Sequence, residues 1–169
     1  MPAASRRYSA RDTELLTWVH DVFTDSFLVC HQIWGGPIPG GADRYVREWA
    51  TAGELVGVQS PPRSAAELHS QLDEFRRSGA LTSDDRVAEA VRFLRSPGLK
   101  QSIMPAYRIL FAGAVASIPP EYRALLGLKR AWWPAITATR LTLWGIRQVL
   151  RGASGSELAA RKRLARLGL

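Results

Sequence analysis

The stretch DTELLTWVHDVFTDSFLVCHQIW, residues 12–34, decides the fold class of this chain. Asp12 or Thr13 caps the start of a helix, and the glycines that follow Trp34 end it. At about 100° per residue the stretch forms one wide apolar stripe. Its members are Leu15, Val19, Val22, Ser26, Val29 and Ile33, flanked by Leu16, Phe23, Phe27, Cys30 and Trp34. A stripe of this width predicts one long helix that lies deep in the fold.

Glycine and proline divide the rest of the chain into segments of helical length. Further helices are expected at about residues 42–56, 64–78, 82–95, 99–117, 121–126, 129–150 and 156–167. Pro105 either starts or interrupts the helix expected at 99–117. Ser64 and Glu67 form the Ser-x-x-Glu pattern that satisfies free backbone N–H groups at a helix start. No segment alternates apolar and polar residues long enough for a convincing strand. The sequence therefore predicts an all-α, single-domain bundle of about six to eight helices.

Two further helices have expected core faces. The helix at 42–56 is expected to bury Tyr45, Trp49, Ala52 and Val56. In the helix at 129–150, Trp133 and Trp144 are expected in the core, whereas Trp132 is left open between core, membrane surface and partner groove. The face of the helix at 42–56 follows from helical spacing, whereas core is the preferred of several interpretations for Trp133 and Trp144.

Composition limits the class of protein. The 169 residues fit one domain, and 46% apolar residues suffice for a core. Cys30 is the only cysteine, which excludes an intramolecular disulfide and a site of several thiolates and suits a reducing compartment. Residues 1–10 lack the apolar run of a secretory signal, and residues 103–118 are too short to span a membrane. The expected location is the cytoplasm, with peripheral membrane association as the alternative.

Positive charge is concentrated in the last third of the chain. Residues 101–169 hold 11 Lys or Arg and two Asp or Glu, whereas residues 1–100 hold 12 and 13. We therefore expect residues 129–169 to form basic amphipathic helices packed on a helical core of residues 1–128. Such a surface is either simply solvated or attracts a membrane or an acidic partner, and nucleic acid is the disfavoured partner.

Motifs of the common enzyme classes are missing: the sequence has no phosphate-binding loop, dinucleotide fingerprint, zinc-protease pair or nucleophile elbow. His20 lies at the border of the apolar stripe, with Thr24 one turn away. It is either a haem-iron ligand or a core histidine that neighbouring groups satisfy. His31 and His69 have polar neighbours and are expected at the surface. The acids on or beside apolar helices, Asp21, Asp25, Glu48 and Glu54, are expected on exposed helix faces.

Several ordered blocks of sequence resemble one known family. They are Tyr8-Ser9-Ala10-x-Asp12-x-x-Leu15-Leu16-x-Trp18-Val19-His20, Asp25-Ser26-Phe27-Leu28, Tyr45-x-x-Glu48, Gly53-Glu54-Leu55-Val56-Gly57-Val58, Pro62-Arg63-Ser64-x-x-Glu67-Leu68 and Ile118-Pro119-Pro120-x-x-Arg123. Together they span about 120 residues. In this order they resemble the MpaB-like oxygenases, a family that includes the rubber oxygenases.

The resemblance implies a helical protein that holds haem b through a histidine and uses O2 to oxidise a small apolar, isoprenoid-like substrate. It makes His20 the candidate haem-iron ligand (and so the candidate metal ligand) or a cavity-lining residue. It adds Phe27 as a haem contact and Thr24 and Glu48 as candidate catalytic residues.

The sequence also departs from the family pattern. The family's Arg and Thr motif and its haem-ligating histidine lie upstream of the first block, and only seven residues precede Tyr8 here. The expectation is therefore a haem-dependent oxygenase that lacks the N-terminal part of the domain and is inactive if the ligand region is missing. The alternative is a non-catalytic helical interaction module or one half of a split oxygenase, completed by self-association or by a partner chain that supplies the missing helices.

Overall fold

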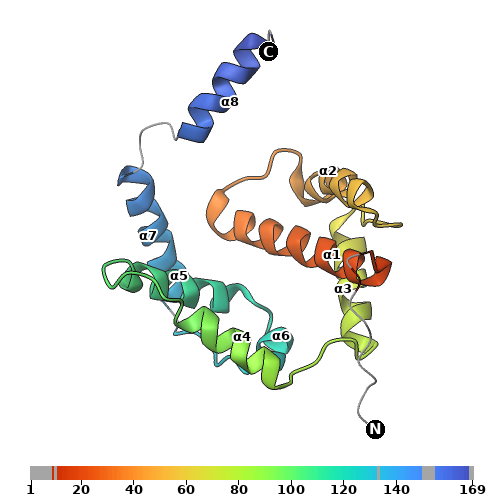
Figure 1. Ribbon diagram of the computed structural model, residues 1–169, viewed down its shortest axis with the longest axis horizontal. Coiled ribbons are helices and arrows are strands. Elements are labelled where there is room, and N and C mark those ends of the chain that lie inside the picture. Colours follow the sequence, from red (N-terminus) through yellow and green to blue (C-terminus); the bar gives the residue numbers. More distant parts are fainter. Residues whose placement is uncertain (1–8, 10, 133, 150–154, 168–169) are drawn as a thin grey trace. The chain divides into compact units, whose positions relative to one another are not determined.

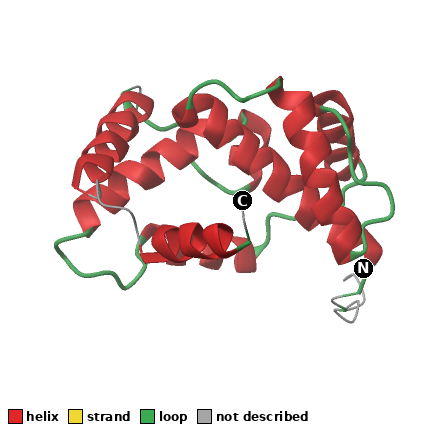
Figure 2. Ribbon diagram, turned by 90° about the horizontal axis from the view of Figure 1, so that it is seen from above, coloured by secondary structure: helices red, strands yellow, loops and turns green. Residues whose placement is uncertain are grey.

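The computed structural model describes residues 9, 11–132, 134–149 and 155–167, and within them the regular structure is helical, without a strand (Figures 1 and 2). The helices, in chain order, are α1 (Thr13–Cys30), η1 (His31–Gly35), α2 (Gly41–Val56), α3 (Ala65–Arg77), α4 (Asp85–Arg95), α5 (Met104–Ser117), α6 (Pro120–Leu125), α7 (Ala135–Val149) and α8 (Gly155–Arg166). The all-α class is confirmed. None of the described helices has both the length and the apolar character needed to cross a membrane.

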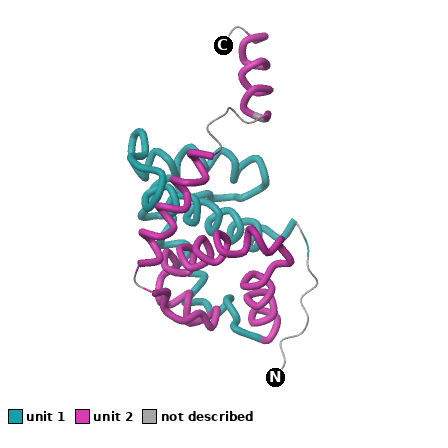
Figure 3. The backbone as a smooth tube through the Cα atoms, turned by 90° about the vertical axis from the view of Figure 1, so that its left-hand side faces the viewer, with its two compact units in different colours: residues 1–84 teal, residues 85–169 magenta. Residues whose placement is uncertain are grey.

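The chain divides into two compact units, residues 1–84 and residues 85–169 (Figure 3, teal and magenta). Unit 1 contains α1, η1, α2 and α3, and unit 2 contains α4 to α8. The candidate site residues His20, Thr24, Phe27 and Glu48 all lie in unit 1.

Local sequence signals set the helix boundaries. The Oδ1 atom of Asp12 accepts hydrogen bonds from the backbone N–H groups of Glu14 (3.1 Å) and Leu15 (3.4 Å), which makes Asp12 the cap of α1. At the start of α3 the Oγ atom of Ser64 accepts from the N–H of Glu67 at 3.2 Å. In the usual pattern the carboxylate of Glu67 would accept from the N–H of Ser64. Here it accepts from the N–H of Arg63, one residue earlier.

The long helix predicted for residues 12–34 changes character near its end. It runs as α1 to Cys30 and continues as the π-helical turn η1 to Gly35, after which Gly36 has φ +91°. A side chain is strained at such a φ, so Gly36 allows the chain to leave the helix at this point. Pro105 lies in the first turn of α5 and starts that helix rather than interrupting it.

The core of unit 1 joins three helices. Its buried members are Leu28 of α1, Val46 of α2, and Leu68 and Leu72 of α3. Partly buried apolar side chains surround them, namely Trp18, Val22, Ile38, Ala42 and Tyr45. This small core holds α1 against both α2 and α3.

The predicted core face of α1 is wrong in part: Val22 packs against the core as expected, but other members of the stripe do not. Its buried residues are His20, Asp21, Thr24 and Leu28. Val19, Phe23 and Phe27 are instead 41%, 53% and 49% exposed. Gly53 of α2 lies against His20, and His69 of α3 contacts Asp25, so these neighbours cover polar positions of the helix. The same shift affects α2, which buries Val46, Ala50 and Gly53 and leaves Val56 exposed.

In unit 2, α5 and α7 pack closely. Gly113 of α5 lies so near Thr139 of α7 that an added β-carbon would be 2.8 Å from Cβ of Thr139. The hydroxyl of Thr139 donates to the backbone carbonyl of Ile109 at 3.1 Å. Trp144, predicted in the core, is 63% exposed, because it lies about 140° around α7 from Thr139. Trp132 is 55% exposed, and Trp133 lies outside the described residues.

Candidate functional site

His20 lies on the side of α1 that packs against α2, and its side chain is 6% exposed. The Nε2 atom of its imidazole is buried without a hydrogen-bond partner. A β-carbon built at Gly53 of α2 would lie 2.9 Å from this Nε2 and 3.0 Å from Cβ of Pro61. The imidazole is thus enclosed by α2 and Pro61. Its burial lowers the pKa of His20, so the neutral form prevails at neutral pH.

Asp21 is the neighbouring buried group, and its side chain is 0% exposed. Neither carboxyl oxygen has a hydrogen-bond partner among the described residues. Burial raises the pKa of Asp21 to about 7, so the carboxyl exchanges its proton near neutral pH. The expectation of an exposed acid here is wrong, because α3 covers this side of α1: Trp18 contacts Phe75, and Asp25 contacts His69.

The other predicted site residues have different surroundings. Thr24 is buried, and its hydroxyl donates to the backbone carbonyl of His20 at 2.8 Å. The hydroxyl therefore belongs to the same part of α1 as the imidazole. Glu48 is exposed on α2, where it pairs with Arg44 at 2.8 Å. The structure brings His20 and Thr24 together and leaves Glu48 at the surface.

Phe27 belongs to a row of aromatic rings on unit 1. Its ring stacks on Phe23 at a centroid distance of 6.0 Å and on Trp49 of α2 at 5.6 Å. The ring of Trp49 lies 6.3 Å from that of Tyr45. We call Phe23, Phe27, Tyr45 and Trp49, together with the exposed Val19 of α1 and Val56 of α2, the aromatic face.

The aromatic face is unusual because it is apolar and only half covered. Phe23 and Phe27 are each about half exposed, and Val56 is 58% exposed. Partly exposed large apolar side chains on two adjacent helices are typical of a surface that binds a ligand or a partner. Flat aromatic walls of this kind suit a planar, apolar molecule.

The fit of haem to these residues has two parts. The aromatic face offers apolar contacts to the flat faces of a porphyrin, and this part fits. The Nε2 atom of His20 points at Gly53 rather than at open space, so His20 does not fit as an iron ligand unless α2 moves away from it. In the described part of the chain, no group of three or more His, Cys, Asp or Glu side chains is placed to hold a metal ion.

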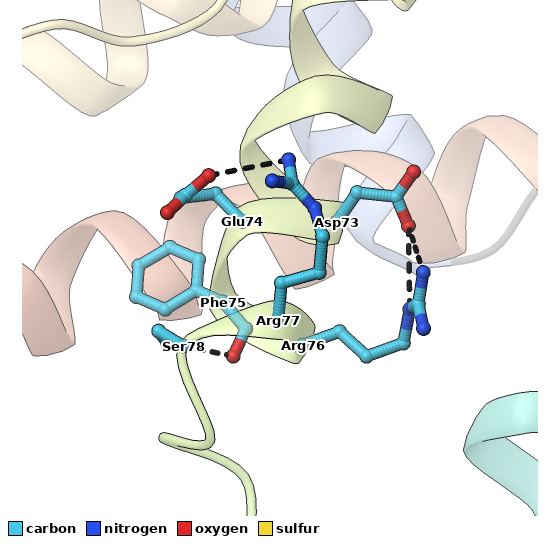
Figure 4. A network of polar contacts seen from close by, with 6 residues as sticks. All are labelled: Asp73, Glu74, Phe75, Arg76, Arg77 and Ser78. Atoms are coloured by element: carbon cyan, nitrogen blue, oxygen red, sulfur yellow. Dashed lines mark hydrogen bonds and ion pairs between the residues drawn. The ribbon is translucent and has the colours of Figure 1, made fainter.

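An open groove lies elsewhere on unit 1, between the start of α1, residues 59–60 and α3. Its lining is Thr13, Glu14, Thr17, Gln59, Ser60, Gln71, Glu74, Phe75 and Ser78. Figure 4 shows the α3 side of this groove, where Glu74 pairs with Arg77 at 3.2 Å and the hydroxyl of Ser78 donates to the carbonyl of Phe75. Most of its lining residues are polar, but apolar atoms make up the larger part of the lining surface, and none of the site residues predicted from the sequence lies in it.

Sequence reasoning missed Asp21 and Gly53. Gly53 carried a usable signal, because a glycine inside a helix costs stability and often marks a close approach by another group. Asp21 carried no comparable signal, since its burial depends on how α3 is placed. The buried polar pair of His20 and Asp21 is thus a product of the tertiary fold.

Comparison with known proteins adds one finding. A family model described as "ER-bound oxygenase mpaB/B'/Rubber oxygenase, catalytic domain" matches residues 1–152. The matched range contains His20, Thr24, Phe27 and Glu48, and it ends before α8 begins at Gly155. No curated protein and no solved structure matches the chain.

Proposed function

The chain belongs to the family of MpaB-type and rubber oxygenases, and on this premise we propose that it is a haem-dependent oxygenase-type protein that uses O2 to oxidise a small apolar substrate. Haem b, when bound, supplies the activation of O2. The chain's own residues bind the apolar reactants and keep water away from them.

The observation that carries the proposal is the aromatic face. Phe27 stacks between Phe23 and Trp49, and Val19 and Val56 extend the same apolar surface. Burying the exposed half of a large apolar side chain contributes roughly 1 kcal/mol to the free energy of binding. A planar macrocycle or an apolar substrate that covers this row would gain several such contributions.

His20 and Thr24 have supporting roles in the proposal. In the observed conformation the hydroxyl of Thr24 bonds the backbone of the turn that carries His20, which helps to fix the orientation of that turn. The imidazole then forms part of the wall behind the aromatic face. If α2 shifts at Gly53, the Nε2 atom becomes free to bind iron, which is the ligand role that the family resemblance suggests.

A haem titration tests the proposal. We expect the purified chain to shift the Soret band of added haem at micromolar concentration, and the double variant Phe23→Ser, Phe27→Ser to bind at least roughly tenfold more weakly. Phe93→Ser, on α4 in unit 2, is the matched control, because Phe93 is also exposed (69%). No Soret shift, or equal losses in both variants, contradicts haem binding at the aromatic face.

His20→Ala separates the two roles of the imidazole. A changed Soret position with retained affinity identifies a ligand, whereas an unchanged spectrum identifies a wall residue. The oxygenase activity itself requires O2 uptake that depends on both haem and an apolar alkene.

The second candidate is a non-catalytic interaction module that uses the same surface. Its support is the exposure of Val19 and Phe23 on α1, which another protein's apolar helices would also cover. A complex or homo-oligomer that forms without haem, and that Phe27→Ser dissociates, favours this candidate. A monomer that takes up haem favours the oxygenase.

A further inference from the structure

The helix α8 differs from the rest of the chain in its exposure. Each residue of α8 whose burial is described is exposed, including Leu158 (49%) and Leu164 (48%). It comprises 12 residues. A solvated helix of this length is only marginally stable unless a surface holds its apolar side. It also lies beyond residues 1–152, so the catalytic-domain match does not account for it.

The charge of this region indicates the kind of surface. Residues 129–169 contain nine Lys or Arg residues and one acidic residue, Glu157. The carboxylate of Glu157 pairs with Arg161 at 2.6 Å. Lys162, Arg163 and Arg166 therefore form a patch whose own helix has no second carboxylate to neutralise it, and a negatively charged surface complements it.

Leucines accompany these cations. At about 100° per residue, Ala160 and Leu164 share one side of α8 with Leu167, the residue after the helix. Arg163 borders this side, Arg166 and Lys162 lie further round the helix, and Leu158 lies on the opposite side. Leu167 is 66% exposed. A helix with adjacent apolar and basic sides lies flat at a bilayer surface, where the leucines enter the acyl region and the cations meet lipid phosphates and carboxylates.

The outer side of α7 has the same combination. Leu141 and Trp144 are each 63% exposed, and Arg147 follows Trp144 by about one helical turn. Tryptophan beside arginine is typical of the interface between headgroups and acyl chains. Nucleic acid would satisfy the arginines of α7 and α8 but would leave Leu141, Trp144 and Leu164 in water, so an anionic bilayer complements these residues better.

We propose that α8, together with the outer side of α7, attaches this protein to the surface of a bilayer that contains anionic lipids. The attachment is peripheral and depends on two signals, apolar insertion and charge attraction. It does not depend on haem binding. It brings the protein to a phase in which small apolar molecules concentrate.

Vesicle sedimentation with the full chain tests this proposal. Large vesicles of phosphatidylcholine alone, or with about 30% phosphatidylserine, are incubated with the protein at low and at physiological salt. We expect binding to the anionic vesicles only, weakened by salt. The triple variant Lys162→Glu, Arg163→Glu, Arg166→Glu should bind at least roughly tenfold more weakly. Leu164→Ser with Leu167→Ser should also weaken binding.

The matched control changes the same net charge elsewhere. Arg92→Glu, Arg95→Glu and Lys100→Glu alter exposed cations of α4 and of the segment after it, and this variant should keep at least half of the binding. Equal loss in both triple variants overturns the proposal in favour of nonspecific charge attraction. Absence of binding to anionic vesicles, or tighter binding to duplex DNA under the same conditions, also overturns it.

Discussion

The imidazole of His20 lies against the backbone of Gly53, so closely that a β-carbon at residue 53 would stand 2.9 Å from its Nε2 atom. Gly53 is one of the three buried residues of α2, with Val46 and Ala50. This contact sets how near α2 approaches α1, and with it the width of the aromatic face that both helices share.

Gly53→Ala should therefore destabilise the protein. An added methyl group within an ordinary helix interior stabilises by about 1 kcal/mol, but at residue 53 it would overlap His20 and Pro61. We expect a net loss of about 1–3 kcal/mol in the free energy of unfolding, measured by urea denaturation. Gly145→Ala, inside α7 with nothing within 4 Å, is the matched control and should stabilise. Similar effects of both substitutions would contradict the close contact.

Asp21 should make stability depend on pH. Its pKa is about 7 in the fold and about 3.8 in the unfolded chain, so the folded state holds the proton more tightly. The stabilisation from the protonated carboxyl is complete below about pH 3.8 and is lost as the pH rises to about 7, with a limiting slope of about 1.4 kcal/mol per pH unit. Asp21→Asn removes this slope and should be more stable than the wild type at pH 8.

The measurement is the difference between the two unfolding free energies at each pH. Taking the difference removes the contribution of His20, which has the opposite sign. Because the pKa of His20 is lowered in the fold, its contribution to stability is complete above about pH 6.5 and is lost as the pH falls. Parallel curves for the wild type and Asp21→Asn would show that Asp21 is hydrated or paired in solution.

In unit 2 the hydroxyl of Thr139 should contribute measurably to stability. Thr139→Val keeps the volume but removes the hydrogen bond to the carbonyl of Ile109, at a cost of about 1 kcal/mol. Thr137→Val, on an exposed position of the same helix, should change the free energy of unfolding by less than about 0.5 kcal/mol. Equal effects in thermal denaturation would argue against the α5–α7 contact.

Trp144 should behave as a surface residue in solution. Trp144→Ser should change stability by less than about 0.5 kcal/mol, because 63% of the side chain is exposed. Leu68→Ala, which empties a fully buried position of the unit 1 core, should cost about 2–5 kcal/mol. A large loss for Trp144→Ser would support the core position that was expected from the sequence.

Sequence patterns predicted where the helices are better than which sides they bury. Caps and breakers such as Asp12, Ser64 and Pro105 act within one turn, so local sequence determines the boundaries they set. The side that α1 buries depends on α2 and α3, which are separate in sequence. Val19 and Phe27 were expected in the core because they are apolar, yet each is nearly half exposed, whereas His20 and Asp21 are buried.

The candidate site shows the same limit. The resemblance of the Trp18-Val19-His20 block directed attention to the middle of α1, where the hydroxyl of Thr24 donates to the backbone carbonyl of His20. It also reveals that Asp21 is buried and that Gly53 closes the space beside the imidazole. Both features depend on contacts between helices that are separate in the sequence. The spacing of residues in a single sequence does not predict such contacts.

The π-helical turn η1 has a consequence for variation in chain length. Its hydrogen bonds span one residue more than those of α1, so the turn behaves as an α-helix that has absorbed a single-residue insertion. Deleting the exposed Gln32 would let α1 continue in regular register up to Gly36. Related chains that are one residue shorter at this point can therefore keep both flanking helices, and they would differ mainly in the direction in which the loop leaves.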